Sequence, residues 1–324
     1  MASTRDRIIA LLSDHCNSYL SGQAISDQLN ISRTAVWKQM KVLKQDGYLI
    51  EAIPNKGYRI LSTPDKLSEN TLRWGLETNW LGKSIYFHEK IDSTQTKANQ
   101  LAQSGCEHGT VVLADRQEAG RGRMNRTWYS DHNDGIWMSI VLRPTVLPSQ
   151  AAQFTLLMGT VLADVLTEKT GLSIKIKWPN DLFINDKKIA GILTEMQAEQ
   201  DQIHYLVIGI GINVNQTTQQ FDTAIRQKAT SLREAAAQSF SKRDLIQSIL
   251  HAFEIQYEQY NETGFSEIKK RWEKRGYKMN QHVTYQSGNT RSEGIIRGIG
   301  QDGALLLQDK DGEVHSLYSA EIDW

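Results

Sequence analysis

Apolar positions recur at helical spacing through most of residues 1–63 and then change to strand spacing. Ser32 is a good helix N-cap, and Val36, Met40 and Leu43 follow it on one helical face. Helices are predicted at 8–12, 21–29 and 33–45, and strands at 48–53 and 58–61. Three helices followed by a hairpin are the order of a winged helix-turn-helix domain.

The middle part, residues 64–273, is longer and mixes both periodicities. Residues 151–169 keep one apolar stripe at three- to four-residue spacing, and Gly171 follows the end of this predicted helix. Strands come in runs instead of alternating with helices, which favours a mixed or antiparallel sheet with helices on one side. The predicted strands lie at 84–89, 109–114, 135–142, 173–178, 181–184, 189–197 and 205–214, and the predicted helices at 95–103, 151–169 and 243–260.

The last part, residues 274–324, consists of short apolar runs separated by turn sequences. Asp302-Gly303 and Asp311-Gly312 stand between such runs, and Asp-Gly is a strong hairpin signal. Short strands over about fifty residues predict a small SH3-like β-barrel. The fold class is therefore α+β, with a winged helix-turn-helix over 1–63, a central mixed-sheet α/β domain over 64–273 and the barrel over 274–324.

Charge changes the interpretation of the first part. The whole chain has a net charge of zero, so any contact with nucleic acid must come from a local excess of basic residues. Between Leu29 and Ile60 there are six basic and two acidic residues. This excess predicts a DNA-binding face, although a solvated basic helix in a small packing domain is the alternative. The candidate DNA-binding residues are Ser32, Arg33, Thr34, Lys38, Lys41 and Lys56.

The sequence also limits where the protein works. Cys16 and Cys106 are the two cysteines, which is too few for a disulfide framework, and neither belongs to a CxxC pair. Residues 1–20 lack the pattern of a signal peptide, and no run of about 18 apolar residues occurs. We therefore expect a cytoplasmic protein without a membrane partner.

Several familiar catalytic motifs are missing from the sequence. The eight histidines are scattered, and neither HExxH nor a closely spaced Cys/His set occurs, so no metal site is predicted. The nucleophile elbow, the Walker A motif and the protein-kinase motifs are also missing. An enzyme with this sequence should therefore work by positioning and charge neutralisation, without a covalent side-chain intermediate.

Residues 116–128 form the most unusual stretch of the chain. Gly120 and Gly122 let the backbone approach a ligand closely, and three arginines lie within six residues. Forked guanidinium donors and bare amides suit a polyanion, although an ordinary exposed loop or an RNA-contacting segment has the same composition. The three arginines are Arg121, Arg123 and Arg126.

Polar residues also follow an apolar strand at residues 176–181. Pro179 stiffens the strand exit, so Asn180 and Asp181 are presented at a rigid end. The alternative is an ordinary β-turn, because Asn-Asp is a common turn pair.

Glycines interrupt two later apolar strands. Gly191 permits close approach to the strand that follows Lys188, although a lysine at such a position is usually solvated. Gly209 and Gly211 leave one face of their strand without side chains, where a flat ligand or a packed helix could lie.

These stretches occur together and in order: Asp92-Ser-Thr94, Gly120-Arg-Gly-Arg123 with Trp128, Lys177-Trp-Pro-Asn-Asp181, Lys188-Ile-Ala-Gly191 and Gly209-Ile-Gly-Ile-Asn213. As a set they resemble the bifunctional biotin protein ligases, also called biotin operon repressors, over nearly the whole chain. The resemblance implies a catalytic domain related to class II aminoacyl-tRNA synthetases and lipoate ligases. It also implies that biotin reacts with ATP and Mg²⁺ to form biotinyl-5′-AMP, that biotin passes to a lysine of a carrier protein, and that biotin genes are repressed.

The resemblance further implies residue roles. The implied biotin-binding residues are Ser93, Thr94, Gln117, Gly120, Arg121, Arg123, Trp128, Lys188, Gly191 and Gly209. The first three of these would hydrogen-bond the ureido ring of biotin. The implied nucleotide-binding residues are Lys177, Asn180 and Asn213, and the implied catalytic residues are Lys188, Arg123 and Asp181. In the second step Asp181 would orient or deprotonate the acceptor lysine. Electrostatics fits these roles, because the carboxylate of biotin and the α-phosphate of ATP repel each other unless cations neutralise them.

The implied partners are operator DNA and the biotin carboxyl carrier protein of acetyl-CoA carboxylase, with pyruvate carboxylase as a second candidate. A homodimer whose formation is linked to ligand binding is also implied. Many members carry a basic residue and then glycine where this chain has Met124 and Asn125, which bears on loop rigidity and a dimer contact. The alternatives are a lipoate-type protein ligase and a ligand-sensing transcription factor without ligase activity.

Overall fold

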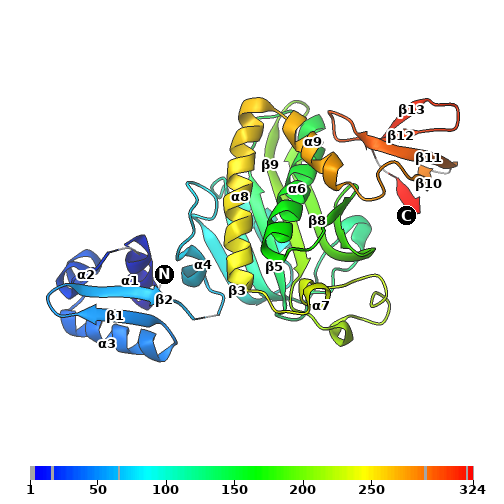
Figure 1. Cartoon of the computed structure of the whole chain (residues 1–324). Coiled ribbons are helices and arrows are strands. Elements are labelled where there is room, and N and C mark those ends of the chain that lie inside the picture. The colour runs from blue at the N-terminus through cyan, green and yellow to red at the C-terminus, as the bar shows by residue number, and fades with distance from the viewer. Residues whose placement is uncertain (1–3, 16–17, 65, 288–289, 319, 324) are drawn as a thin grey trace. The chain divides into compact units, whose positions relative to one another are not determined.

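In a computed structural model the chain forms two compact units, Met1–Thr78 and Asn79–Trp324 (Figure 1). The structure describes residues 4–15, 18–64, 66–287, 290–318 and 320–323. Within these residues, every helix is too short or too polar to cross a membrane. The predicted boundaries after residues 63 and 273 stay predictions.

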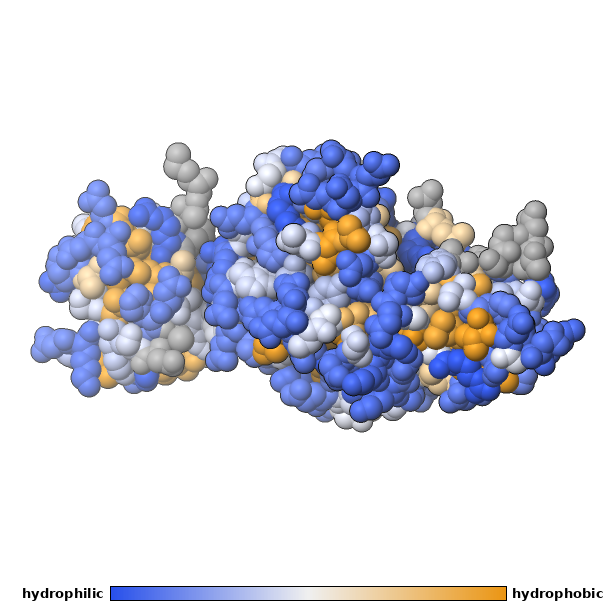
Figure 2. All heavy atoms as spheres, turned by 90° about the horizontal axis from the view of Figure 1, so that it is seen from above, coloured by the Kyte–Doolittle hydropathy of each residue, from blue (hydrophilic) through white to orange (hydrophobic). Residues whose placement is uncertain are grey.

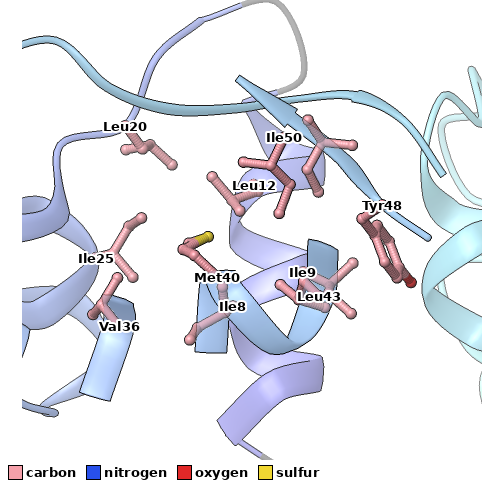
Figure 3. Close-up of a cluster of buried hydrophobic side chains, with 11 residues drawn as sticks. Ile8, Ile9, Leu12, Leu20, Ile25, Val36, Met40, Leu43, Tyr48 and Ile50 are labelled. Atoms are coloured by element: carbon pink, nitrogen blue, oxygen red, sulfur yellow. The ribbon is translucent and has the colours of Figure 1, made fainter. Parts of the chain in front are cut away.

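The first unit contains the predicted winged helix-turn-helix. Its core is built from side chains of all three helices and of the hairpin, among them Ile8, Ile25, Met40 and Ile50 (Figure 3). The Ser32 hydroxyl accepts a hydrogen bond from the Ala35 amide at 3.1 Å and so caps the third helix as predicted. The elements are α1 (Thr4–Asp14), α2 (Gly22–Leu29), α3 (Arg33–Gln45), β1 (Leu49–Ile53), β2 (Gly57–Ser62) and α4 (Glu69–Arg73).

The second unit is built on a seven-stranded sheet with the order β3-β4-β5-β9-β8-β7-β6. The β3–β4 pair is parallel and the other pairs are antiparallel, so the predicted mixed sheet is confirmed. The strands are β3 (Ile85–Ile91), β4 (Val111–Gln117), β5 (Gly135–Leu142), β6 (Lys175–Lys177), β7 (Asp181–Ile184), β8 (Lys187–Ala198) and β9 (Ile203–Asn213).

Helices cover both faces of this sheet, so the prediction of helices on one side is wrong. In Figure 1, α6 (Ala151–Thr170) and α8 (Lys242–Thr263) lie in front of the strands, and α6 also packs against α8 and α9 (Ser266–Arg275). On the other face, α5 (Thr94–Gln103) packs Ala98 against Val112, Val141 and Val207. The remaining helix is α7 (Leu232–Ala236). In the view of Figure 2, hydrophilic residues cover most of the surface of this unit and apolar residues form small separate patches.

One buried carboxylate fixes the start of the second unit. Glu254 in α8 is 3% exposed and accepts hydrogen bonds from three successive backbone amides. The donors are the amides of Asn79, Trp80 and Leu81, at 2.5, 2.9 and 2.8 Å. Because consecutive amides in an irregular segment have no ladder partners, Glu254 supplies the acceptors that the backbone there requires.

The C-terminal part forms a five-stranded antiparallel sheet with the order β13-β12-β11-β10-β14. Gly303 in the predicted Asp-Gly turn has a φ of 87°, and its carbonyl accepts a hydrogen bond from Trp178 Nε1 at 3.1 Å. This bond joins the C-terminal sheet to the central sheet. Closure of the strands into an SH3-like barrel stays a prediction. The strands are β10 (His282–Ser287), β11 (Thr290–Ile299), β12 (Leu305–Gln308), β13 (Val314–Leu317) and β14 (Glu321–Asp323).

Candidate active site and DNA-binding face

A buried cluster of hydroxyl and amide groups lies where α5 begins. The backbone amide of Thr94 donates to Gln117 Oε1 at 2.8 Å, and the hydroxyl oxygen of Thr94 lies 3.0 Å from the same atom. Thr94 Oγ1 also lies 2.9 Å from Ser139 Oγ in β5. The Ser93 hydroxyl beside them is buried and makes no hydrogen bond within the described part of the chain. The structure therefore brings together the three residues that the resemblance assigns to the ring of biotin.

The loop at residues 120–128, here called the Gly-Arg loop, is held to the same cluster by hydrogen bonds. The amide of Trp128 donates to the carbonyl of Gly120 at 2.9 Å. Gln117 Nε2 donates to Ser130 Oγ at 3.1 Å, and that hydroxyl donates to the carbonyl of Trp128 at 3.1 Å. A Cβ at position 120 would lie 2.3 Å from both Ser130 Oγ and the Trp128 carbonyl, so this close approach requires glycine.

Gly191 in β8 and Gly209 and Gly211 in β9 form a patch of the sheet without side chains of its own, here called the floor. Other side chains of the protein cover it. A Cβ at Gly211 would lie 2.5 Å from the Trp128 indole, and one at Gly191 would lie 3.0 Å from it. A Cβ at Gly209 would lie 2.4 Å from Gln95 Oε1. The face predicted to be bare is therefore occupied by a flat indole over one pair of glycines and by an amide over the third.

Positive charge gathers beside this floor around one carboxylate. Lys188 Nζ lies 2.7 Å from Asp181 Oδ1 and 5.2 Å from the Trp128 ring centroid. The pKa of Lys177 is lowered to about 8, chiefly by burial; Asp181 opposes the shift, and three neighbouring ammonium groups contribute to it. Those neighbours are Lys188, Lys278 and Lys228. Lys177 thus interacts with three other lysines and one carboxylate, an excess of positive charge that favours a polyanion.

Arg123 joins this cationic region through a fixed amide. Its Nη1 donates to Asn180 Oδ1 at 3.1 Å, and Asn180 Nδ2 donates to the carbonyl of Ile192 at 2.8 Å. The Trp178–Pro179 peptide bond is cis at this strand exit. Burial lowers the pKa of Arg123, and the nearby Asp181 carboxylate opposes the shift. Asn180 thus orients a guanidinium that faces the same carboxylate as the lysines.

A cavity of about 200 Å³ adjoins Arg123 and Asn180. Asp302, Gly303 and Tyr318 from the C-terminal sheet contribute to its wall. The Tyr318 hydroxyl donates to Asp302 at 2.6 Å, and this bond lowers the pKa of the Asp302 carboxyl. The sequence identified the turn at 302–303 only as a hairpin signal, so this contribution was missed.

Two of the predicted binding residues make other contacts in the structure. Arg121 Nη2 donates to Glu195 Oε1 in β8 at 2.8 Å, which neutralises its charge. Asn213 Nδ2 donates to the carbonyl of Thr230 at 3.0 Å. Their ligand-binding roles stay predictions. Lys228 and Lys278 were missed because each lies outside every recognised motif and reaches the site only through the fold.

The exposed face of α3 carries most of the predicted DNA-binding residues. Trp37 lies on the same face with 49% of its surface exposed, and Lys41 Nζ lies 4.2 Å from its ring centroid. An exposed tryptophan on a helix of a small domain is unusual and was missed from the sequence, where its position suggested no role. The exposed residues among those predicted are Ser32, Arg33, Thr34, Lys38 and Lys41 on α3 and its cap, and Lys56 in the hairpin turn.

Comparison with family models agrees with this geometry. Residues 87–213 match the biotin/lipoate A/B protein ligase family, residues 4–59 match an HTH domain, and residues 278–323 match the biotin protein ligase C terminal domain. The solved biotin protein ligase from Aquifex aeolicus in complex with biotin and ATP aligns with 74% of this chain and 98% of its own, with a TM-score of 0.64 and 27% identity. The fold and the site thus define a biotin ligase catalytic unit fused to a DNA-binding domain.

Full-length relatives narrow this class to one family. The bifunctional ligase/repressor BirA of Bacillus subtilis (strain 168) is 43% identical over 324 residues, which cover 100% of this chain and 99% of that protein. The bifunctional ligase/repressor BirA of Escherichia coli (strain K12) is 30% identical over 98% of this chain and 95% of its own length. The chain belongs to the family of bifunctional ligase/repressor BirA proteins.

Proposed function

We propose that this protein activates biotin with ATP, transfers it to a lysine of a biotin carboxyl carrier protein, and represses biotin genes through its winged helix. The main support for the proposal is that two chemically different environments lie side by side in the second unit. A buried polar cluster at Thr94 and Gln117 suits a neutral polar ring, and the lysines around Asp181 suit phosphates. The Trp128 indole and Gly191 lie between them, where an aliphatic chain would pack.

In the first step, the carboxylate of biotin attacks the α-phosphorus of ATP, and pyrophosphate leaves. Both reactants are anions, so their approach requires cations at the point of contact. Lys188 and Arg123 are placed for that role, with Lys177, Lys228 and Lys278 behind them. Asn180 would hold Arg123 toward the nucleotide. The remaining assignments from the resemblance, including Asn213, Arg121 and Gly209, belong to the same proposal.

In the second step, the ε-amine of the acceptor lysine attacks the carbonyl of the mixed anhydride, and AMP leaves. Asp181 is the carboxylate in this region, and it is paired with Lys188 at 2.7 Å. A phosphate that binds Lys188 would compete for that ion pair and free Asp181 to receive the incoming ammonium. The same aspartate would then orient the amine and take up its proton.

Mg²⁺ fits this site as a companion of the triphosphate, where it would neutralise phosphate charge, because magnesium keeps few protein ligands when phosphates supply the rest. Among the described residues, Asp309, Glu313 and His315 form the group of three side chains placed to share an ion. That group lies at the turn between β12 and β13 in the C-terminal sheet. Magnesium would therefore enter the lysine-rich site bound to the phosphates of ATP.

A direct assay tests the ligase proposal. The protein is incubated with ATP, a carrier protein and either radiolabelled biotin or radiolabelled lipoate. We expect label from biotin alone to reach the carrier. Transfer of lipoate would favour the lipoate-type alternative, and the lack of biotin-dependent pyrophosphate release would favour a ligand-sensing transcription factor without ligase activity.

The pKa of Lys177 predicts the pH dependence of nucleotide binding. The ammonium form binds phosphate, and with a pKa of about 8 it is lost as the pH rises through that value. We expect the KM for ATP to rise roughly tenfold between about pH 7 and pH 9, since a charged hydrogen bond contributes about 1.5–3 kcal/mol. Lys177→Arg should remove the pH dependence, and an equal rise in that variant would contradict the assignment.

The DNA-binding role makes a prediction about salt. A residue that contacts phosphate contributes about one unit to the slope of log K against log salt concentration. We expect Arg33→Ala and Lys38→Ala each to weaken operator binding and to lower this slope by about 1, while ligation is unchanged. Lys83→Ala removes one positive charge from the second unit and is the matched control. An unchanged slope in both α3 variants would show that Arg33 and Lys38 do not contact phosphate.

The further partners are also part of the proposal. A repressor of this kind reads two half-sites as a dimer, and we infer that ligand binding promotes dimerisation through the Gly-Arg loop. Met124 in that loop is 73% exposed, which suits a contact surface. Sedimentation with and without biotin plus ATP tests the idea, which fails if the association constant does not change. The carrier of acetyl-CoA carboxylase, that of pyruvate carboxylase and a cytoplasmic location stay predictions.

A further inference from the structure

A continuous series of polar contacts runs beneath the polar cluster. It begins at the ion pair between Arg121 of the loop and Glu195 in β8, which measures 2.8 Å. Glu195 Oε2 accepts from Gln95 Nε2 at 3.0 Å, and Gln95 Oε1 accepts from the Ser139 hydroxyl at 3.2 Å. Ser139 then contacts Thr94 at 2.9 Å, and Thr94 contacts Gln117 at 3.0 Å. The series therefore leads from the loop to the residues assigned to the ring of biotin.

The surroundings of Gln95 determine which way its amide points. Its Nε2 faces three acceptors: Glu195 Oε2 at 3.0 Å, the carbonyl of Val207 at 3.2 Å and the carbonyl of Leu193 at 3.4 Å. The opposite orientation would direct the amide oxygen at two carbonyls and a carboxylate, which is repulsive. Gln95 is 4% exposed, so water is not a general substitute for these partners. Its oxygen must therefore face Ser139.

The two hydroxyl groups cannot satisfy all three of their contacts at once. Thr94 and Ser139 have one proton each, whereas three contacts join them to each other, to Gln95 and to Gln117. Gln117 Oε1 already accepts the Thr94 amide at 2.8 Å. Gln95 Oε1 has Ser139 as its donor among the described residues. Leaving a buried acceptor unsatisfied costs about 1–3 kcal/mol, so Ser139 should donate to Gln95 and Thr94 to Ser139.

We propose that Gln95, oriented by Glu195, is a positioning residue that draws both hydroxyl protons toward itself and leaves lone pairs on Thr94 Oγ1 and Gln117 Oε1 for the N–H groups of a cyclic urea. This inference rests on the proposed function. It explains selection of biotin over a ligand whose ring has no N–H donor, such as lipoate. Gly209 is required because a Cβ there would displace Gln95. The Arg121–Glu195 ion pair also links the loop to the orientation of Gln95.

Three variants interrupt the series at different elements: Gln95→Met in α5, Ser139→Ala in β5 and Glu195→Gln in β8. In Gln95→Met, the Ser139 proton loses its acceptor and turns to Thr94 Oγ1, so the Thr94 proton is directed at Gln117 Oε1. In Ser139→Ala, Gln117 Oε1 is the acceptor that remains for the Thr94 proton, and in both variants this proton competes there with the ligand. We expect the KM for biotin in pyrophosphate exchange to rise about tenfold, with kcat at saturating biotin within about twofold, because the reacting carboxylate end is untouched. Glu195→Gln should give a smaller rise of the same kind. Gln100→Met, on the exposed face of α5, should leave both constants unchanged.

Two biotin analogues, each methylated at one nitrogen of the urea, test the chemistry directly. In the unmodified protein, kcat/KM for at least one analogue should be about ten times lower than kcat/KM for biotin. The same ratio of biotin to analogue should fall below about threefold in Gln95→Met and Ser139→Ala. An unchanged ratio, or a fall in kcat without a rise in KM, would overturn the inference. Misfolding of one variant leaves the others informative, because they alter separate elements. Failure of the unmodified protein to use biotin at all would instead overturn the proposed function.

Discussion

Lys188→Ala is expected to lower the rate of biotin-dependent pyrophosphate exchange by about a thousandfold, so that adenylate formation nearly disappears. Lys188 lies 2.7 Å from Asp181 and beside the Trp128 indole, at the junction of the polar cluster and the cationic region. Its removal also takes away the ion pair of Asp181, which adds repulsion against both anionic substrates. Operator binding should be retained, because α3 belongs to the other compact unit.

Lys187→Ala is the matched control for this prediction. Lys187 is the preceding residue in β8 and is exposed, so its loss changes the net charge by the same amount. The rate of pyrophosphate exchange by Lys187→Ala should stay within about twofold of the rate of the unmodified protein, as expected of a surface substitution. Normal exchange by Lys188→Ala would remove this lysine from the mechanism. An unchanged urea denaturation of the second unit would show that the variant is folded, because operator binding reports on the other unit.

The largest expected effect on stability is that of Glu254→Leu. This substitution leaves three backbone amides, those of Asn79, Trp80 and Leu81, without their carboxylate acceptor. Since each hydrogen bond to a charged group contributes about 1.5–3 kcal/mol and leucine recovers part through burial, we expect a loss of about 4 kcal/mol in the free energy of unfolding. Urea denaturation of the second unit, followed by circular dichroism, measures the change.

Glu262→Leu provides the comparison on the same helix. Glu262 is exposed near the end of α8, and its replacement should change the free energy of unfolding by less than about 0.5 kcal/mol. Glu254→Gln keeps one oxygen acceptor and should fall between the two. Equal stability of Glu254→Leu and Glu262→Leu would show that the three amides find other acceptors.

Elements with strong local periodicity were predicted well from the sequence. The strands β5 and β7 and the helix α3 have the predicted ends, and α6 ends one residue later than predicted, at a left-handed Gly171. The helix α9 was missed, because Ile268 and Trp272 are its buried residues and the rest is mainly charged. Ion pairs of its arginines with Asp164 in α6 help hold it in place, and such tertiary contacts leave no periodic signal.

The site was predicted in part for the same reason. Short motifs identified Thr94, Gln117 and Lys188, since each motif lies where a strand or a helix begins or ends. The motifs gave no indication of Gln95 and Glu195, whose hydrogen bonds join residues one hundred positions apart. Contacts of that range depend on which strands become neighbours, and local patterns do not determine this order.

The Trp128 indole has a practical consequence for following the reaction. It rests on Gly191 and Gly211, and its Nε1 is buried without a partner within the described residues. An aliphatic chain that packs against the ring changes its surroundings, so the fluorescence emission of the ring should shift when the site is occupied. The chain has eight tryptophans, and the difference between the spectra of the unmodified protein and Trp128→Phe isolates this one. The protein thus carries an optical reporter of occupancy that needs no attached dye.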